Sequence, residues 1–419
     1  MVVLKFGGTA MRHHPYEVLA RIWGCCKRKQ PIVVVVSALA GVTDALIGGN
    51  VAEVRQILSA WKRENSLGRG FEEVAEILAF CDRCVLTPSK NLLVSMGEKI
   101  SAVLLCELMA QCLPVRGAPV WADVGVVTLH AAECVANGMH VLRCRKRCLV
   151  PVVTGFCARD ALSGTTRLLG RNGSDTTATL LAKELREDCV IFSDVAGIMT
   201  ADPRICRVAQ PINFLTFAEV RELAFHGASV LHGKSIEFAE KNVGRQLIVA
   251  HVADCAWRQN GTVVGPSSDL EKNAGIVATT LLRHRVGISV KAERGVPGFA
   301  CSVFQKVCGS GVSVEMFSQT CSETSICLVV PASVQQLVKT ALQDFTVAIT
   351  EELAILTVVG EGMHNTPGVA SRVCARLADC DINIRSISQG ASETSLSVAV
   401  SESKALVALH AVHDILLMQ

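Results

Sequence analysis

A lysine and two glycines close to the start of the chain form a segment suited to binding phosphate. Lys5, Gly7 and Gly8 follow directly on an apolar run that begins at Val2. Glycines at the end of a strand let the backbone approach an anion, and successive N–H groups can then point at phosphate oxygens. The lysine would supply a mobile positive charge for the same oxygens. The Walker A pattern, GxxxxGK followed by Ser or Thr, is absent, and a plain tight turn explains this string at least as well.

A second glycine-rich segment, Gly170 to Thr177, precedes an apolar stretch of helical character. Ser174 or Asp175 could cap that helix. A guanidinium from Arg171 beside exposed N–H groups at a helix N-terminus would instead bind a carboxylate or a phosphate. The segment by itself leaves the helix cap and the anion site open.

Two further acidic segments could contact ligands. Glu98 ends the string Ser95 to Glu98, which is predicted to open a helix over 98–111. A carboxylate in a first turn usually complements the helix dipole and becomes a ligand only if the site holds an ammonium group. The polar loop from Ser193 to Arg204 follows a very apolar strand. Ligands sit at the carboxyl ends of strands in open α/β sheets, so this loop could hold a nucleotide and, indirectly, magnesium. A solvated loop would have a similar composition.

The elements that must position these residues alternate between short Val/Ile runs and amphipathic stretches up to about residue 265. Candidate strands are Val2–Phe6, Ile32–Ser37, Val150–Phe156, Val190–Asp194 and Gln246–Val252, and candidate helices include Asn91–Gln111 and Thr176–Arg186. This alternation predicts an α/β domain with a parallel-rich sheet covered on both faces. The polar, turn-rich stretch from Gly261 to Ala274 is typical of a connection.

The last third of the chain contains an internal repeat. Pro297-Gly298 recurs as Pro367-Gly368, an offset of 70 (367 − 297) that also aligns Ser318-Gln319 with Ser388-Gln389 and Ser322 to Ser325 with Ser392 to Ser395. The predicted helices are Phe299–Cys308 and Ala332–Leu342 in the first copy, and Val369–Leu377 and Glu402–His413 in the second. The pattern predicts two ferredoxin-like βαββαβ domains. The repeat does not by itself indicate ligand binding, because a module that serves only dimerisation would also be duplicated.

Composition narrows the function classes. Hydrophobic residues make up 50% of the chain and charged residues 19%, with a net charge of +3, so we expect an ordered protein without a nucleic-acid or anionic membrane partner. The basic cluster Arg143 to Arg147 reads as a solvated helix end. No apolar run reaches the roughly 18 residues of a membrane helix, and the N-terminus does not resemble a signal peptide, so we expect a cytoplasmic protein.

The 19 cysteines are scattered along the chain. Scattered cysteines in a long chain without a secretory signal are typical of reduced, buried thiols. The one CxxC pair, Cys81 and Cys84, lacks a second pair or histidines at matching spacing. We therefore expect no metal site built from protein ligands.

In this order, the segments resemble the aspartate kinase family of the amino-acid kinase superfamily, with paired ACT domains at the C-terminal end. The strings that carry the resemblance are Lys5 to Thr9, Val36 to Ala38, Gly41 to Asp44, Ser95 to Glu98, Gly155-Phe156, Gly170 to Thr177, Ser193 to Arg204, Phe217 to Ala224 and His226 to Ala228. The resemblance covers essentially the whole chain. It implies a three-layer kinase domain over residues 1–265, a connector over 266–284, and ACT domains over 285–350 and 351–419.

The resemblance also implies an activity and its residues: transfer of the γ-phosphoryl group of ATP, with Mg²⁺, to the side chain of L-aspartate. Lys5 would hold the phosphoryl group, Asp175 would position Lys5, and Gly7 and Gly8 would bind the phosphates. Glu98 would accept the substrate ammonium. The other substrate-binding residues would be Thr43, Arg171 and Ser174, and the other ATP-binding residues Ser193, Asp194, Thr200, Asp202 and Arg204. The aspartate carboxylate is ionised near neutral pH and needs no general base. The product, 4-phospho-L-aspartate, would enter the routes to lysine and diaminopimelate, threonine and methionine.

The resemblance further implies feedback inhibition by an amino acid, with lysine as the first candidate, at the ACT domains of a homodimer or tetramer. The effector-binding residues implied are Gly298, Phe299, Ala300, Glu315, Ser322 and Glu323.

Two departures from the family pattern stand out. Ser229 replaces a lysine that lies near ATP in relatives, and Lys234 follows five residues later. Asn172 replaces a glycine, a mild change because Asn tolerates left-handed backbone. A glutamate or acetylglutamate kinase would explain the phosphate segments but not the repeat, and an amino-acid-sensing pseudokinase would explain Ser229. Because the chain ends with the second repeat, we expect no fused homoserine dehydrogenase.

Overall fold

The computed structural model describes residues 1–65, 71–85, 90–112, 117–119, 124–125, 150–159, 165–170, 172–228, 231–267, 275–291, 298–319, 325–364, 366–390 and 392–417. The chain divides into two compact units. The first consists of Met1–Ile198, Pro211–Phe217 and Ser229–Pro266, and the second of Met199–Gln210, Ala218–Ala228 and Ser267–Gln419.

The described part of the first unit forms an eight-stranded sheet in the order β3-β5-β2-β1-β8-β10-β11-β9. Its strands are β1 (Val2–Phe6), β2 (Ile32–Val36), β3 (Gly117–Pro119), β5 (Val150–Thr154), β8 (Asp188–Ser193), β9 (Phe214–Thr216), β10 (Leu247–His251) and β11 (Thr262–Gly265). The central strand β1 runs parallel to both β2 and β8, and only β11 pairs antiparallel, with β10. Every residue of β1, β2 and β5 is buried, which is why these strands read as continuous apolar runs. The predicted parallel-rich sheet is confirmed.

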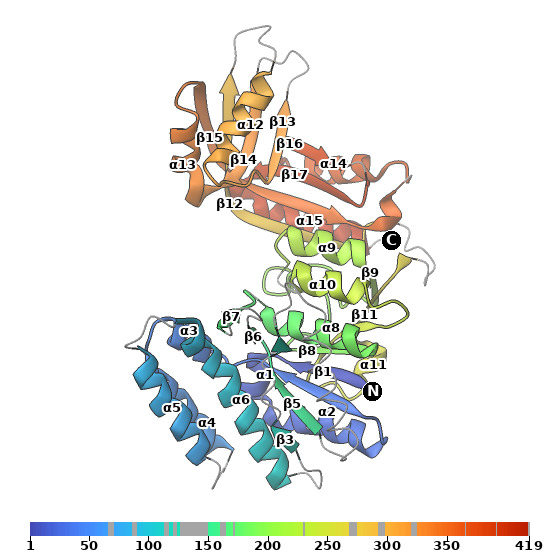
Figure 1. Ribbon diagram of the computed structural model, residues 1–419. Coiled ribbons are helices and arrows are strands. Elements are labelled where there is room, and N and C mark those ends of the chain that lie inside the picture. The colour runs from blue at the N-terminus through green and yellow to red at the C-terminus, as the bar shows by residue number, and fades with distance from the viewer. Residues whose placement is uncertain are drawn as a thin grey trace. The chain divides into compact units, whose positions relative to one another are not determined.

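Helices cover both faces of this sheet (Figure 1). The helices are α1 (Gly8–His13), α2 (Pro15–Lys27), α3 (Val42–Ile47), α4 (Val51–Glu64), α5 (Phe71–Val85), α6 (Lys90–Cys112), α8 (Gly173–Leu185), α10 (Gly233–Glu240) and α11 (Trp257–Asn260). Leu4 and Phe6 of β1 share one buried core with Ile22 of α2 and Leu104 of α6. Lys5, which alternates with them along the strand, lies on the face covered by α8.

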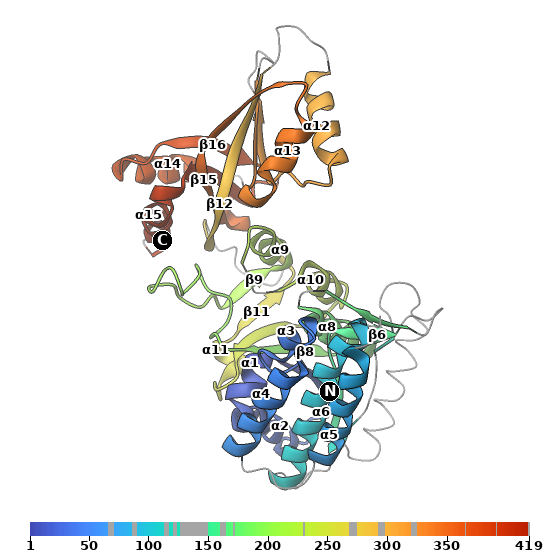
Figure 2. The same ribbon diagram turned by 90° about the vertical axis from the view of Figure 1, so that its left-hand side faces the viewer.

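Two smaller features complete the first unit. Helices α4, α5 and α6 lie side by side (Figure 2). The short strands β4 (Val124–Gly125), β6 (Cys157–Arg159) and β7 (Thr166–Leu168) form a three-stranded sheet. The basic cluster Arg143 to Arg147 lies outside the described residues.

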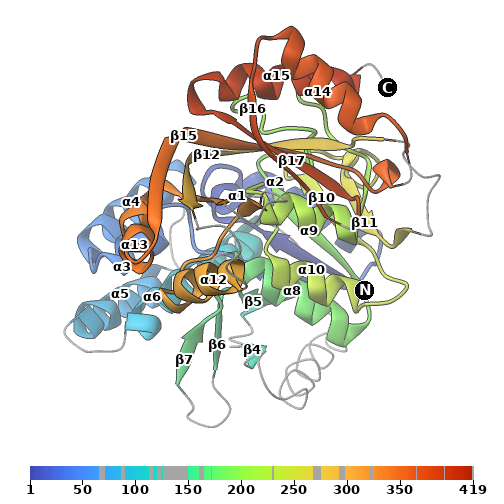
Figure 3. The ribbon, with the colours of Figure 1, turned by 90° about the horizontal axis from the view of Figure 1, so that it is seen from above.

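The described part of the second unit contains a six-stranded sheet in the order β13-β14-β12-β15-β17-β16, with every neighbour antiparallel. The strands are β12 (Ala278–Lys291), β13 (Met316–Gln319), β14 (Ser325–Pro331), β15 (Thr346–Val359), β16 (Ile384–Gln389) and β17 (Ser395–Ser401). The helices are α12 (Phe299–Gly309), α13 (Gln335–Ala341), α14 (Val369–Asp379) and α15 (Ala405–Leu417). Helix α13 lies within its predicted stretch, and the other three helices end one to four residues later than predicted. Helices α14 and α15 lie side by side (Figure 3).

The long strands β12 and β15 serve both repeats. Their pairing begins at Ala278↔Val359, ends at Lys291↔Thr346, and shifts register between Leu282 and Arg285. Residues after that shift belong to the core of the first repeat, where Val286 packs, whereas Leu281 packs against the core of the second repeat. The last strand of the second ferredoxin-like repeat therefore precedes the first repeat in sequence. The expected connector, 266–284, accordingly contains the first part of β12.

Two segments from the first 265 residues belong to the second unit. The loop Met199–Gln210 is held there by Thr200, whose carbonyl accepts from the N–H of Thr279 (2.8 Å). Helix α9 (Phe217–Phe225) is held by Glu219, whose carboxylate accepts from the N–H of Glu361 (2.8 Å), and by Glu222, which accepts from Ser395 Oγ (2.7 Å). Domain boundaries drawn along the sequence thus describe only part of this arrangement.

The cysteines in the described residues carry free thiols, some buried, such as Cys81 and Cys189, and some exposed, such as Cys301. Within the described ranges, no cluster of three or more His, Cys, Asp or Glu could hold a metal ion. No described helix is long and apolar enough to cross a membrane.

Candidate active site

A buried ion pair lies at the centre of the first unit. Lys5 stands near the carboxyl end of β1, and its Nζ lies 2.6 Å from Oδ1 of Asp175 in the first turn of α8. The two side chains are only 11% and 6% exposed. Charges this far from water persist only when paired. The pair brings together the two residues predicted to be catalytic.

Close packing requires the second glycine after Lys5. A Cβ on Gly8 would lie 2.3 Å from the carbonyl oxygen of Ala38, a distance that real Cβ atoms do not show, whereas a Cβ on Gly7 would lie 3.5 Å from Lys5 Nζ, an ordinary contact distance. Gly7 is the N-cap of α1, and no described side chain caps this helix end. The first N–H groups of a helix have no partner within it, so they lie beside Lys5 as potential donors to phosphate.

Glu98 is a buried carboxylate that is only partly satisfied. It lies inside α6, which begins at Lys90, so the prediction that it stands in the first turn of its helix is wrong. It is 2% exposed, and its Oε1 accepts a bond from the N–H of Ala38 at 3.3 Å. Its Oε2 has no hydrogen-bond partner among the described residues. Burial raises the pKa of Glu98 to about 8. A cation bound at Oε2 would favour the ionised form and satisfy the oxygen, as expected for a residue that binds a substrate ammonium group.

The turn between β2 and α3, residues 37–41, connects these features. Ala38 packs so closely on α6 that a Cβ on Gly97 would lie 2.9 Å from Ala38 Cβ. Gly41 has a left-handed backbone (φ 89°) and begins α3, on which Thr43 is half-buried. Sequence reasoning did not identify Ala38 as the partner of Glu98, since a backbone contact leaves little mark on residue type. The only nearby feature of the sequence that reflects this contact is Gly97, directly before Glu98, because a glycine there allows the close approach of Ala38.

The second glycine-rich segment forms the N-terminus of α8. Asn172 is its N-cap and adopts the left-handed conformation (φ 53°), which fits its substitution for glycine. Ser174 is buried against Gly155, where a Cβ would lie 2.6 Å from Ser174 Cβ. Arg171 lies outside the described residues.

The predicted nucleotide residues divide between the two units. Ser193 ends β8, and its Oγ donates to Asp194 Oδ1 (3.0 Å). Thr200, Asp202 and Arg204 belong to the second unit. Arg204 forks onto Asp202 through Nε and Nη2, which lowers the pKa of Asp202.

Thr200 is tied to the C-terminal helix. Its Oγ1 lies 2.9 Å from Nε2 of His413 on α15 and accepts from the N–H of Gln210 at 2.9 Å. The part of the predicted nucleotide loop that belongs to the second unit, from Met199 on, is therefore held by the second ACT-like repeat. Ser229 lies outside the described residues, and Lys234 is exposed on α10.

The predicted effector residues lie at the start of α12 and before β13. Gly298 is the left-handed N-cap of α12 (φ 79°), Phe299 is buried against Phe345, and Ala300 is half-buried. Glu315 already has a cationic partner, because Nε and Nη2 of Arg285 each lie 2.8 Å from one of its carboxylate oxygens. Ser322 and Glu323 lie outside the described residues.

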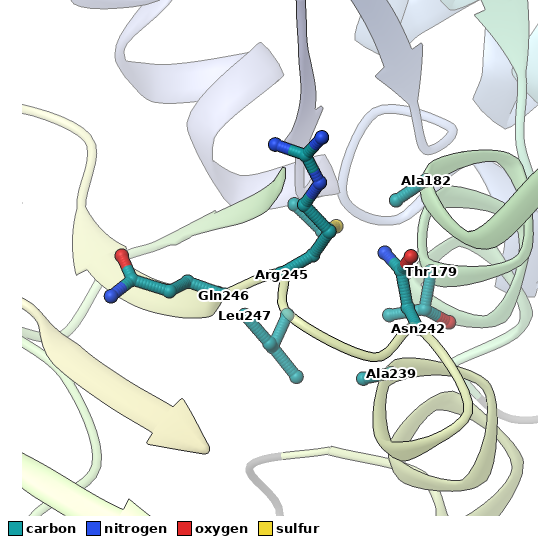
Figure 4. A pocket seen from close by; sticks show the side chains of 8 residues that line it. Thr179, Ala182, Ala239, Asn242, Arg245, Gln246 and Leu247 are labelled. Carbon is teal, nitrogen blue, oxygen red and sulfur yellow. The ribbon is translucent and has the colours of Figure 1, made fainter. Parts of the chain in front are cut away.

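A hollow elsewhere in the first unit is not this site (Figure 4). Its lining residues are Thr179, Ala182, Cys189, Ala239, Asn242, Arg245, Gln246 and Leu247. Cys189 and Leu247 stand at the amino ends of β8 and β10, whereas Lys5 stands near the carboxyl end of the parallel strand β1. The hollow therefore lies at the edge opposite to that where ligands of open α/β sheets bind.

Comparisons with known proteins agree with this architecture. The amino acid kinase family model matches residues 1–252, and an ACT domain model matches residues 287–344 and 356–416. The aspartokinase of Geobacillus stearothermophilus is 29% identical over 436 residues, which cover 99% of this chain and 96% of that relative. The bifunctional aspartokinase/homoserine dehydrogenase of Haemophilus influenzae is 33% identical over 287 residues, which cover 64% of this chain. This match spans only 34% of that longer relative.

Among solved structures, Escherichia coli aspartokinase III has a TM-score of 0.77 in each of two complexes, with 99% of both chains covered. Its complex with aspartate and ADP is described as the R-state and is 25% identical to this chain. Its complex with lysine and aspartate is described as the T-state and is 26% identical.

Proposed function

The chain belongs to the amino acid kinase family, and within it to the aspartate kinases with C-terminal ACT domains, and from this premise we propose the reaction that its site performs. The γ-phosphoryl group of ATP is transferred to the side-chain carboxylate of L-aspartate, giving 4-phospho-L-aspartate. The observation that carries the proposal is the buried pair of Lys5 and Asp175 beside Gly7 and the close-packed Gly8.

The residues suit recognition of an α-amino acid. Glu98, with one buried oxygen lacking a described partner, receives the substrate ammonium. In the proposal Arg171 binds the α-carboxylate through its planar guanidinium, and Thr43 and Ser174 provide hydroxyls. Ammonium and α-carboxylate are common to all α-amino acids, so the fit of the side chain must distinguish aspartate from glutamate.

Catalysis then rests on positioning and charge. The substrate carboxylate and the ATP phosphates repel each other, and Lys5 neutralises part of this charge as the phosphoryl group moves. Asp175 holds Lys5 at a fixed place on β1. Gly7 and Gly8 offer N–H groups to the phosphates, and Ser193, Asp194, Thr200, Asp202 and Arg204 bind the nucleotide. The attacking carboxylate is already ionised at neutral pH, so no side chain needs to remove a proton.

Magnesium fits this site as a companion of ATP. The described residues offer the exposed carboxylate of Asp194 at the carboxyl end of β8 but no cage of several protein ligands. Mg²⁺ typically retains water and binds nucleotide phosphates together with one or two carboxylates. Bound in this way it would neutralise phosphate charge.

We also propose that an amino acid inhibits the enzyme at the ACT domains of a homodimer or tetramer, with lysine as the first candidate. The proposed effector-binding residues are Gly298, Phe299, Ala300, Glu315, Ser322 and Glu323. The lysine complex of the E. coli relative supports this choice. The ion pair of Glu315 with Arg285 adds a condition, because an effector ammonium would have to replace Arg285. As part of the same proposal, the enzyme works in the cytoplasm, in the first step towards lysine and diaminopimelate, threonine and methionine.

The test is to trap the acyl phosphate with hydroxylamine. Purified protein is incubated with Mg-ATP and L-aspartate, with L-glutamate in parallel and Lys5→Ala as the control. Hydroxamate from aspartate alone, lost in Lys5→Ala, supports the proposal. Hydroxamate from glutamate alone would identify a different kinase of the family, and ATP binding without product from either would identify a pseudokinase. Titration with lysine, threonine and methionine tests the effector, and no response to any of them would refute it.

A further inference from the structure

Arg12 contacts the turn that carries the substrate-binding residues. It lies on α1, the helix that begins at Gly8, and its Nη1 donates to the carbonyl oxygen of Ala40 at 2.6 Å. A Cβ on Gly41 would lie 3.2 Å from the same nitrogen, so the glycine leaves room for the guanidinium. None of the functions described above uses this side chain.

The phosphate-binding side of the site holds the same turn through the backbone. The N–H of Ser37 donates to the carbonyl of Phe6, and the N–H of Ala40 donates to the carbonyl of Gly8, each at 3.1 Å. With Arg12 added, residues 37–41 are joined at three points to the segment that contains Gly7 and Gly8.

The opposite side of the turn reaches the amino-acid side of the site. The N–H of Ala38 donates to Glu98 Oε1, and α3, which follows directly, carries Thr43. Turn 37–41 is thus the shared support between the phosphate-binding glycines and the carboxylate assigned to the substrate ammonium. Any shift of the turn would alter the separation of the two substrates, and phosphoryl transfer depends steeply on that separation.

We propose that Arg12 is a positioning residue for the amino-acid substrate: by clamping Ala40, it holds Glu98 and Thr43 at a fixed distance from the phosphate-binding glycines. The inference rests on the proposed function and deepens it, since it assigns a residue to the aspartate side of the reaction. The competing explanation is that Arg12, in the last turn of α1, only complements the helix dipole. Loss of that role would lower the stability of the protein and would not weaken aspartate binding more than ATP binding.

The test compares Arg12→Met, which keeps much of the apolar stem of the side chain and loses the donors, with Arg12→Lys, which keeps a charged donor. Arg63→Met, at an exposed arginine on α4, is the matched control. The hydroxamate assay gives KM for aspartate and for ATP separately, and thermal unfolding with and without L-aspartate gives a readout independent of turnover.

We expect Arg12→Met to raise KM for aspartate about tenfold, the loss typical of a hydrogen bond to a charged group. KM for ATP should not change, and the stabilisation by aspartate should shrink. The unfolding temperature without ligand should fall only slightly, because Arg12→Met also loses one hydrogen bond within the protein. Arg12→Lys should restore most of the affinity, and Arg63→Met should behave as the wild type. If Arg12→Met fails to fold, Arg12→Gln, polar but too short to reach Ala40, carries the same expectation.

Unchanged KM for aspartate in both Arg12→Met and Arg12→Gln would overturn the inference. Equal losses of aspartate affinity, ATP affinity and thermal stability would also overturn it and indicate a purely structural role. Wild-type protein that forms no hydroxamate would instead refute the proposed function, so the two failures are distinguishable.

Discussion

Lys5 and Asp175 meet across the face of the central strand, with Nζ and Oδ1 2.6 Å apart and both side chains buried. Each charge makes the burial of the other tolerable. Removing either partner should therefore have consequences beyond the loss of one contact.

We predict that Asp175→Asn destabilises the protein by about 3 kcal/mol, because it leaves the buried ammonium of Lys5 without its counter-charge. Lys5→Met should abolish turnover. The double variant Lys5→Met/Asp175→Leu should recover most of the lost stability but no activity, since it buries no charge. Urea denaturation and the hydroxamate assay measure the two effects separately. A double variant no more stable than Asp175→Asn would contradict the argument.

Glu98 should make aspartate binding dependent on pH. Because burial raises the pKa of Glu98 to about 8, the free enzyme holds this carboxyl protonated at neutral pH, and binding the substrate ammonium requires its ionisation. KM for aspartate should fall as pH rises from 6 towards 8 and then level off. Glu98→Gln should remove this dependence and raise KM on the order of a hundredfold. KM for ATP serves as the internal control, and an identical pH profile in Glu98→Gln would refute the assignment.

The same carboxyl should affect stability with the opposite sign. Its pKa is raised from 4.5 to about 8 in the folded state, so the folded protein binds the proton more tightly than the unfolded chain. Its contribution to stability is complete below pH 4.5 and is lost as pH rises through 8. Without ligand, Glu98→Gln should therefore lose less stability than the wild type between these pH values, as followed by urea denaturation.

Gly8 should tolerate no side chain. In Gly8→Ala the new Cβ would lie 2.3 Å from the carbonyl oxygen of Ala38, which is backbone and cannot rotate away. We expect a destabilisation of about 1–3 kcal/mol, as for overpacking in a core, and loss of ATP affinity. The matched control is Gly24→Ala within α2, where the new Cβ would meet only the flexible end of the Arg28 side chain, at 3.9 Å. It should stabilise the protein by about 0.5–1 kcal/mol, and equal effects of the two variants would contradict the packing argument.

His413 should make the second unit sensitive to acid. Burial lowers the pKa of this histidine below 6.5, the nearby His410 lowers it further, and Asp414 partly offsets the shift. The unfolded chain then takes up a proton that the folded protein does not, so stability is lost as pH falls below 6.5. His413→Phe should reduce this loss, whereas His410→Gln, at an exposed position on the same helix, should retain most of it, because burial is the larger cause of the shift. Thermal unfolding between pH 8 and pH 5 measures the difference.

Because His413 also holds Thr200 (2.9 Å), His413→Phe should weaken ATP binding if Thr200 contacts the nucleotide. KM for aspartate should stay unchanged. An unaltered KM for ATP would remove Thr200 from the proposed nucleotide site.

The local signals in the sequence determined much of this protein. Continuous Val/Ile runs predicted β1 and β2, because a strand buried on both faces has no polar position. The 70-residue repeat predicted the helices of both ACT-like copies. Lys5 and Asp175 could be assigned to one site only through the ordered resemblance to a family, since nothing local links two residues so far apart.

Tertiary structure alone decided which distant groups meet. The last strand of the second repeat comes from residues 278–282, because β12 and β15 pair along their whole length. The first part of β12 pairs with the end of β15 in the second repeat, and the rest of β12 pairs with the start of β15 in the first repeat. Glu315 bonds Arg285, and Glu98 bonds the backbone of Ala38, contacts that depend on strand register and helix packing. Residue patterns record how each segment meets solvent and core, whereas the partners of buried polar atoms are fixed only when the segments pack together.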